Sequence, residues 1–524
     1  MAIKLGKQHN MFRNELLLFT DPKLIKIDNT LVNLFMLMRW KGSKAKVRIG
    51  RVGKGDTSVE KLVKYFQVGE SKGLAEGITK YPKAVEWWIR SNLVNFVNRG
   101  KPDKESFSSF QPIHLQSYLQ RNPKYTRDYF SSEQVYLMLT AKPEVREELY
   151  HYLNQGWDDV RDNLTDKVDL DIDSLGILRL AEANSSATPS PNNPFKHIRP
   201  ILPKQATLFC EDIHKLLVYK SVIPRHVMIE YLKVIVAFHL ALYTMKVITH
   251  LPNMLKAGTT DIATDFSFVV DATDVYTSEV ANLAKKDAAR LYDSLMDYIR
   301  SVFLFNTALR FYRKEKNLNS SDVPLVMKLL SEPPSSFEQF CKAEQDSIFY
   351  DNAVGEEDKE LLKEIFEFEE NDIERYIEIL MKARGGFQYK YHLQLLDSVT
   401  QKNTERGILA GGGRRKNDDR RFSIGIKLLE TLVQLQVLQP KEGSKEFESK
   451  AISIEDFLSG IRERYGIIID GTREERFKNG DLHTHLAFKE NVEAFKSKLR
   501  QIGFYNDLSD AFILQKIKPR YTIE

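Results

Sequence analysis

Apolar side chains recur every three or four positions through most of the chain, which is the spacing of helices with one buried face. The segment Glu279–Lys316 keeps this spacing throughout, so it predicts one long helix or two. Residues 356–378 repeat the pattern with mostly acidic outward positions, which form either a solvated face or a docking surface for a basic partner. A further helix is predicted from Pro224 to Leu251. Its apolar centre is too short to span a bilayer, so we interpret it as a core helix.

The first 180 residues have a mixed pattern. Residues 44–52 alternate basic and apolar side chains, which predicts a strand. Residues 84–97 predict a helix whose large buried face includes Trp87 and Trp88, and residues 131–153 predict further helix. This part of the chain is therefore predicted to be mixed α/β.

Two segments without an apolar period divide the chain, which at 524 residues is too long for one ordinary core. Residues 181–204 are rich in proline and small polar residues, and residues 401–421 contain three consecutive glycines. We therefore predict a mainly α, multidomain protein. Its parts are a mixed α/β N-terminal domain (1–180), a helical domain (205–400) and a C-terminal winged-helix-like domain (422–524), joined by linkers at 181–204 and 401–421.

The C-terminal domain is predicted from the order of its elements. A first helix ends before Pro440, and a second begins at Ser453, whose hydroxyl can cap it, and ends at Gly466. Helix, helix, strand, helix and hairpin is the order of a winged helix. The last three elements are predicted at residues 467–469, 490–501 and 504–518.

Cations on this domain suggest contact with DNA. In DNA-binding winged helices the third helix enters the major groove and the wing touches phosphates. Lysines and arginines lie on the third helix, on the wing and in the preceding linker, where they could neutralise phosphates of one duplex. The candidate residues are Lys496, Lys498, Arg500, Lys516, Lys518, Arg520, Arg414, Arg415 and Lys416, and the linker also carries Arg420 and Arg421. Acids are mixed among these cations, so a protein-docking module is the alternative.

A second basic cluster lies near the N-terminus. The net charge of the chain is only +5, so any nucleic-acid contact must come from such local clusters. Seven cations and no acid occur between Arg39 and Lys54, and Trp40 among them could stack on a base. The alternative is a solvated edge strand protected by lysines. The candidate contact residues here are Arg39, Lys41, Lys44, Lys46, Arg48 and Arg51.

No complete enzyme active site is evident in the sequence. The glycines from Gly50 to Gly55 lack P-loop spacing, and the acids from Asp169 to Asp173 lack the glycine and glutamate of a calcium loop. His483 and His485 have no further ligands at metal-site spacing, so we interpret them as part of a surface loop. We predict no catalytic residue, metal or cofactor. A nuclease with dispersed acids stays open, because such sites leave no contiguous signature.

The cellular location follows from what the sequence lacks. Two distant cysteines are not a disulfide framework, and the first residues do not form a secretory signal. We expect a cytoplasmic protein without a membrane partner.

Three runs resemble a known group of proteins. They are Gly-Gly-Gly-Arg-Arg-Lys-Asn-Asp-Asp-Arg-Arg-Phe-Ser-Ile-Gly-Ile-Lys-Leu-Leu-Glu-Thr-Leu-Val-Gln-Leu at 411–435, Phe-Leu-Ser-Gly-Ile-Arg-Glu-Arg-Tyr-Gly at 457–466, and His-Leu-Ala-Leu-Tyr-Thr-Met-Lys-Val-Ile-Thr-His-Leu-Pro at 239–252. Together they resemble accessory proteins of multi-gene bacterial anti-phage systems of the methylation-associated defence type. The resemblance implies a non-enzymatic subunit that acts beside a methyltransferase, ATPase or nuclease encoded elsewhere.

These observations lead to one main hypothesis. We expect an accessory or scaffold subunit of a defence complex, whose partners are the other subunits and double-stranded DNA held by the two basic surfaces. The alternatives are a protein–protein adaptor without DNA contact and a cryptic nuclease.

Overall fold

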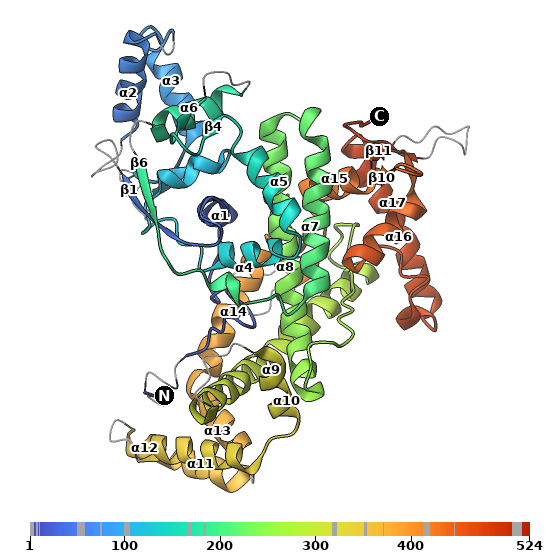
Figure 1. The fold of residues 1–524 in the computed structure, drawn as a ribbon. Coiled ribbons are helices and arrows are strands. Elements are labelled where there is room, and N and C mark those ends of the chain that lie inside the picture. Colours follow the sequence, from blue (N-terminus) through green and yellow to red (C-terminus); the bar gives the residue numbers. More distant parts are fainter. Residues whose placement is uncertain are drawn as a thin grey trace. The chain divides into compact units, whose positions relative to one another are not determined.

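The computed structural model describes residues 5–6, 9, 11–49, 58–73, 76–98, 105–165, 170–182, 185–316, 322–350, 354–369, 371–411, 420–444, 446–505 and 516–524. The protein is mainly helical, as predicted (Figure 1). The chain forms two compact units. The small unit contains Ile25–His197 and Phe209–Val236, and the large unit contains Met1–Leu24, Ile198–Leu208 and Ala237–Glu524.

The small unit combines helices with two-stranded antiparallel sheets. Its helices are α1 (Ile27–Arg39), α2 (Val59–Ser71), α3 (Pro82–Trp88), α4 (Ser131–Leu139), α5 (Pro143–Leu153) and α6 (Ile172–Glu182), with short helical turns η2 (Ile89–Leu93), η3 (Leu115–Leu119), η4 (Pro194–Lys196) and η5 (Tyr219–Ser221). The paired strands are β1 (Ala45–Ile49) with β6 (Ser185–Pro189), β2 (Val94–Asn98) with β3 (Glu105–Phe110), and β4 (Trp157–Asp158) with β5 (Asn163–Leu164).

Helix α1 lies at the centre of the small unit, in contact with α4, α5 and η3. Its side chains from Leu31 to Met38 are all buried, which is why this segment is apolar on every side. Residues of α2, η2 and β2 form a second core cluster around Phe66, Ile89 and Val94. The small unit is therefore held together by long-range packing as well as by its short strand pairs.

Two predictions for this part of the chain need correction. The helix predicted over residues 84–97 ends with η2 at Leu93, because the following run contains Val94 and Phe96 and pairs with β3 as a strand. Trp87, assigned to the buried face, is 72% exposed. The strand predicted over residues 44–52 is confirmed as β1 at Ala45–Ile49, and residues 50–52 lie outside the described residues. Its partner β6 lies within the proline-rich segment 181–204.

Several helices of the large unit contact α9 (Glu279–Lys316), which is one continuous helix (Figure 1). Helices α7 (Pro203–Val218) and α8 (Arg225–Ala257) each belong partly to this unit and partly to the small one. The others are α10 (Val323–Ser331), α11 (Ser335–Phe349), α12 (Glu356–Phe368), α13 (Asp372–Leu380), η6 (Met381–Gly385) and α14 (Gly386–Val399).

Two of these helical segments differ from the sequence pattern. The helix predicted over residues 356–378 is split into α12 and α13, because the Asn371 side chain accepts hydrogen bonds from two backbone amides and starts a new helix. Helix α8 continues through Pro252 to Ala257. It is long and apolar enough to cross a membrane by length and composition, but 89% of its most apolar window is buried in the protein, which fits a core helix.

The C-terminal part of the large unit contains short paired strands and three helices. The helices are α15 (Ile426–Gln436), α16 (Ile454–Tyr465) and α17 (Leu482–Gln501), with a turn η7 (Glu475–Phe477). The antiparallel pairs are β8 (Leu409–Gly411) with β9 (Arg420–Phe422), β10 (Leu438–Pro440) with β11 (Phe447–Ser449), and β12 (Ile452–Ser453) with β14 (Lys516–Ile517). Tyr505 also bridges Ile517.

The local signals in this part are confirmed. The Ser453 hydroxyl accepts a hydrogen bond from the Asp456 amide, and Gly466 ends α16 in the left-handed conformation. The third helix begins earlier than predicted, because Asp481 caps it by accepting from the Thr484 amide. His483 and His485 therefore lie in the first turn of α17 rather than in a loop.

The predicted strand over residues 467–469 has a distant partner. It appears as β13 (Ile467–Ile468), which pairs in parallel with β7 (Phe268–Val269) of the middle part of the chain. The turn of the predicted hairpin, Ser509-Asp510, lies outside the described residues.

Candidate functional site

The inner side of α17 is fixed by a buried amide. Asn491 is fully buried and donates to the carbonyls of Val270 and Ile469, each at 2.9 Å. Its own oxygen accepts from the Ala272 amide at 2.8 Å. One side chain therefore satisfies three buried backbone groups at the β7–β13 pair. Only the outer face of α17 is left for a partner.

That outer face is mixed rather than uniformly basic. Leu482 and Leu486 are 72% and 45% exposed one helical turn apart. Lys496 lies 2.7 Å from the carboxylate of Glu493, and this hydrogen bond raises the pKa of Lys496. The predicted third-helix cations thus stand beside apolar and acidic neighbours.

Most of the other C-terminal cations also have internal partners. Lys498 lies 2.6 Å from Asp274. Arg520 pairs with Glu430 and holds its guanidinium 4.8 Å from the ring centre of Phe504. The guanidinium of Arg500 lies 5.6 Å from the ring centre of Tyr505.

Lys516 in β14 and Lys518 directly after it are exposed to solvent. Lys516 and Lys518 are exposed on either side of the buried Ile517, so they share the outward face of the strand. The Lys518 amide donates to the carbonyl of Phe504 at 2.9 Å, which holds the strand against the end of α17. These lysines are the predicted wing cations with the clearest access to a ligand.

The cations of the glycine-rich segment divide into two groups. Arg414, Arg415 and Lys416 lie outside the described residues. Arg420 binds the carboxylate of Asp397 with two hydrogen bonds of 2.8 and 2.9 Å. Arg421 is buried, with its Nε 2.8 Å from Asp271. Arg420 and Arg421 therefore hold β9 to other segments of the unit instead of facing phosphates.

The pKa of Asp397 agrees with a stable ion pair between Asp397 and Arg420. Burial raises the pKa of Asp397, but hydrogen bonds from Arg420, Lys402 and Tyr292 more than offset this, so its pKa lies below the ordinary range. The carboxylate is therefore negatively charged and neutralises the positive charge of Arg420.

Several side chains of the N-terminal basic run bind other residues of the small unit. Arg39 lies 3.3 Å from Asp159, and its guanidinium covers the ring of Trp40. Trp40 is half-buried and packs against a core cluster, so its ring is not free to stack on a base. Lys44 pairs with Glu133, whose side chain is only 4% exposed.

The remaining residues of this run give a smaller basic surface. Lys41 and Lys46 are exposed. Lys41 has a positive φ of 49°, in the turn that leads from α1 into β1. The side chain of Arg48 and the whole of Arg51 lie outside the described residues. The accessible, described part of the predicted surface therefore consists of Lys41 and Lys46, with the outer part of Lys44.

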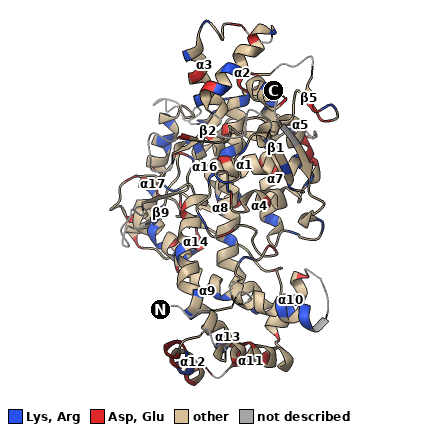
Figure 2. Ribbon diagram, turned by 90° about the vertical axis from the view of Figure 1, so that its left-hand side faces the viewer, with Lys and Arg blue, Asp and Glu red and all other residues tan. Residues whose placement is uncertain are grey.

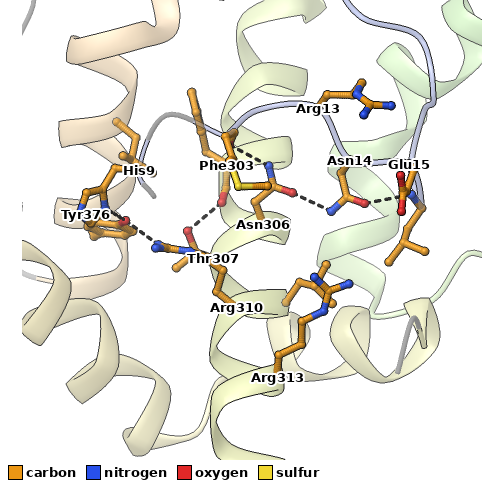
Figure 3. Close-up of a pocket in the computed structure, with 14 residues that line it drawn as sticks. His9, Arg13, Asn14, Glu15, Phe303, Asn306, Thr307, Arg310, Arg313 and Tyr376 are labelled. Carbon is orange, nitrogen blue, oxygen red and sulfur yellow. Dashed lines mark hydrogen bonds between the residues drawn. The ribbon is translucent and has the colours of Figure 1, made fainter. Parts of the chain in front are cut away.

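The large unit contains a cavity of about 190 Å³, lined by both polar and apolar side chains, that sequence reasoning missed. It lies between the N-terminal segment 11–16, α9 and α13 (Figure 3). Asn306, Arg310 and Arg313 face it from one side of α9, at the three-to-four spacing that puts residues on one helix face. No local motif marks such a site, because its walls come from distant segments.

Hydrogen bonds fix the walls of this cavity. The Asn14 amide donates to the Asn306 side-chain oxygen at 2.7 Å, and Asn306 donates to the Phe12 carbonyl at 2.8 Å. On the opposite side, Arg310 donates to the Tyr376 hydroxyl at 2.6 Å, and His9 lies 2.8 Å from the same oxygen. Burial raises the pKa of Tyr376, so it acts as a neutral hydroxyl.

Acidic residues gather on another part of the large unit. Figure 2 shows them along α11 and α12. In α12 the exposed acids recur on one face, at Glu356, Glu360, Glu364 and Glu367. Lys359 pairs with Glu356 in the same helix at 2.9 Å. Both interpretations of this face, solvated surface and docking surface, are compatible with these positions.

Among the residues that the structure describes, no three His, Cys, Asp or Glu side chains come together in a group that could hold a metal ion.

Comparisons with known proteins give one match. No curated protein and no solved structure is similar to the chain. The sequence model of one family, described as methylation-associated defense system protein MAD7, matches residues 7–521. This match covers nearly the whole chain and agrees with the resemblance found in the sequence. The chain therefore belongs to the family of the methylation-associated defense system protein MAD7.

Proposed function

We propose that this protein is a non-catalytic accessory subunit of a methylation-associated defence assembly, and that its C-terminal part contacts double-stranded DNA as a winged helix. The observation that carries the proposal is the pairing of β14, which follows the helices α15, α16 and α17, with both β12 and Tyr505. The strand β12 lies between α15 and α16, whereas Tyr505 and β14 follow α17 and would form the wing of a winged helix.

The wing is the part of this domain best suited to meet phosphates. Lys516 and Lys518 are exposed on one face of β14, whereas Lys496 and Lys498 are each neutralised by an acid of the same unit. Each phosphate contact by a lysine releases about 0.9 counterion on B-form DNA. We therefore expect weak, salt-sensitive duplex binding that depends on the wing more than on α17.

Fluorescence anisotropy of the full chain with a labelled duplex at low salt tests this. Replacing both wing lysines (Lys516→Glu with Lys518→Glu) is expected to weaken binding strongly. A matched variant reverses two exposed lysines elsewhere in the unit (Lys328→Glu with Lys382→Glu) and changes the net charge equally. If the duplex does not bind, or if both variants weaken binding alike, the wing does not contact DNA.

A second candidate function is a protein adaptor, favoured by the exposed leucines of α17. Leu482 and Leu486 are exposed leucines one helical turn apart, and an exposed apolar patch favours a protein interaction site. Co-purification with the products of neighbouring genes, surviving nuclease treatment and lost in Leu482→Ser with Leu486→Ser, would support it. Metal-dependent cleavage of the duplex by the purified chain would instead favour the nuclease alternative.

A further inference from the structure

A pair of aromatic rings lies at the surface of α14 in the large unit. Phe387 is 49% exposed and Tyr391 is half-buried. Their ring centres are 4.6 Å apart, and the ring planes are inclined by 52°. Gly386, directly before Phe387, is exposed, and nothing lies within 4 Å of the position that a Cβ would take. The chain therefore leaves open space next to the ring pair.

Cations lie close to both rings. The guanidinium carbon of Arg384 is 5.8 Å from the centre of the Phe387 ring. The ammonium nitrogen of Lys23, which comes from the N-terminal segment, is 5.4 Å from the centre of the Tyr391 ring. Lys390 follows Phe387 by three positions and Tyr391 follows it by four, so α14 places all three on one helix face. The ring pair therefore has positive charge beside it from two chain segments.

Lys390 is the cation best placed to meet an anionic ligand. It is exposed, and no ion pair joins it to any residue that the structure describes. Residues 379–396 contain no Asp or Glu, so no neighbouring acid in the chain competes for it. The ligand that complements this surface therefore has flat apolar groups and negative charge together.

A single strand of nucleic acid has this chemistry. An unpaired base stacks on an exposed aromatic ring, and the phosphates of the strand meet cations beside that ring. In a duplex the bases are stacked on one another, so their faces cannot reach a ring on a helix surface. The ring pair therefore fits a single strand better than a duplex.

Phe368 provides a contrast within the same unit. It is 83% exposed at the C-terminal end of α12, so it is more accessible than Phe387. However, Phe368 lies between Glu367 and Glu369, at the end of an acidic helix that would repel phosphates (Figure 2). The sign of the neighbouring charge, rather than exposure alone, distinguishes the ring pair of α14.

We propose that this face of α14 binds single-stranded DNA, with a base stacked at Phe387 and Tyr391 and a phosphate at Lys390. The choice of DNA over RNA rests on the proposed function, because a protein that contacts a DNA duplex also meets DNA strands. The face does not include the wing lysines, so each contact can be removed and measured without the other.

Fluorescence anisotropy of the full chain with a labelled oligothymidylate tests the proposal. It is measured on the variant without wing lysines (Lys516→Glu with Lys518→Glu), so that the proposed wing contact does not contribute. Adding Phe387→Ala should weaken binding by about tenfold, the effect of losing one stacked base. Phe387→Tyr keeps a ring and should keep the affinity. If the oligothymidylate does not bind, this proposal is overturned, whether or not the parent binds a duplex.

The matched control is Phe368→Ala, which removes a more exposed ring from the acidic surface and should leave the affinity unchanged. Equal losses in the two alanine variants would reject the site. A strand of abasic nucleotides has the same phosphates without bases, so it should bind more weakly and be indifferent to Phe387→Ala. Tighter binding of oligouridylate, the RNA counterpart, would overturn the assignment to DNA. So would a Phe387→Ala variant that binds the strand normally but no longer co-purifies with a protein partner.

Lys390→Gln tests the phosphate contact. The slope of log affinity against log salt should fall by about 0.7, the value for one phosphate of a single strand. The control Lys328→Gln removes the same charge from an exposed lysine of α10 and should leave the slope unchanged. A slope that does not respond to Lys390→Gln would contradict the assigned contact. All these variants change exposed or partly exposed side chains, so each should unfold thermally like its parent.

Discussion

Arg421 Nε lies 2.8 Å from Asp271 Oδ2, and the two side chains are only 3% and 0% exposed. The ring of Tyr276 covers the guanidinium, with its centre 4.0 Å away. Thr273 donates to the other oxygen of Asp271 through its amide and its hydroxyl, at 2.8 and 2.7 Å. This buried ion pair joins β9 to the segment that follows β7. Arg421, which belongs to the arginine-rich linker, therefore stabilises the fold.

Loss of either partner of this pair should be strongly destabilising. Arg421→Met leaves the Asp271 carboxylate buried without its counter-charge, which costs about 3–5 kcal/mol. Urea-induced unfolding measures this change in the free energy of unfolding. The control Arg520→Met removes the more exposed pair with Glu430 and should cost at most about 1 kcal/mol. Similar losses in the two variants would contradict the assigned role of Arg421.

The small unit should have a stability that depends on pH through Asp128. Burial and the neighbouring Glu133 raise the pKa of Asp128 to about 6, although Ser132 donates to its carboxylate from both amide and hydroxyl. Arg121 and Lys44 are the nearby cations. In the unfolded chain the same group has a pKa of about 3.9. The folded state therefore keeps a proton that the unfolded state loses, and stability from this group falls as pH rises from about 4 to about 6.

The substitution Asp128→Asn tests this, because asparagine stays neutral at every pH. Relative to the parent, the variant should gain stability as pH rises from about 4 to about 6, by up to about 3 kcal/mol for a shift of about two pKa units. Urea unfolding at several pH values measures the difference. Asp158→Asn is the control, since backbone hydrogen bonds lower the pKa of Asp158, and its titration lies below this pH range. A difference for Asp128→Asn that does not change with pH would refute the assignment.

Features decided by neighbouring residues could be predicted from the sequence. Ser453 and Gly466 mark the ends of α16 because capping chemistry acts within one helical turn. The alternation around Lys46 identified β1 because its exposed lysine lies between the more buried Ala45 and Val47. The runs at 239–252, 411–435 and 457–466 also indicated the correct family, which the match over residues 7–521 shows.

Features decided by distant segments could not be predicted. The start of α17 was missed because Leu482 and Leu486 are exposed, so its first turn carries no buried apolar residue. A second segment, remote in sequence, is needed to form the pairing of β13 with β7, the ion pair of Lys498 and the cavity at Arg313. Periodicity within one segment contains no information about which other segment it meets.

The accessible lysines of the N-terminal basic run should affect salt dependence if this surface meets nucleic acid. Replacing Lys41 and Lys46 together by alanine is expected to reduce the slope of log affinity against log salt by about 2, since each phosphate that is no longer neutralised lowers it by about 0.9. Anisotropy with a duplex over a salt series measures the slope. The control replaces Lys64 and Lys72, two lysines at α2 of the same unit. If the slope is the same in both variants, β1 is only a solvated edge strand.

Replacing Gly466 should destabilise the protein through two effects, its backbone conformation and a close contact, which can be measured separately. Its φ of +75° costs a residue with a side chain about 1 kcal/mol, and an added Cβ would lie 1.9 Å from the carbonyl oxygen of Phe266. That oxygen belongs to the backbone and cannot swing away, so β7 itself would have to shift, and we expect Gly466→Ala to cost about 3 kcal/mol in total. Gly443 has the same φ of +75° but nothing within 4 Å of the added Cβ, so Gly443→Ala should lose only the conformational part. Urea unfolding of the two variants yields the cost of the close approach as their difference. A difference near zero would mean that the contact between Gly466 and Phe266 does not constrain the β7–β13 pair.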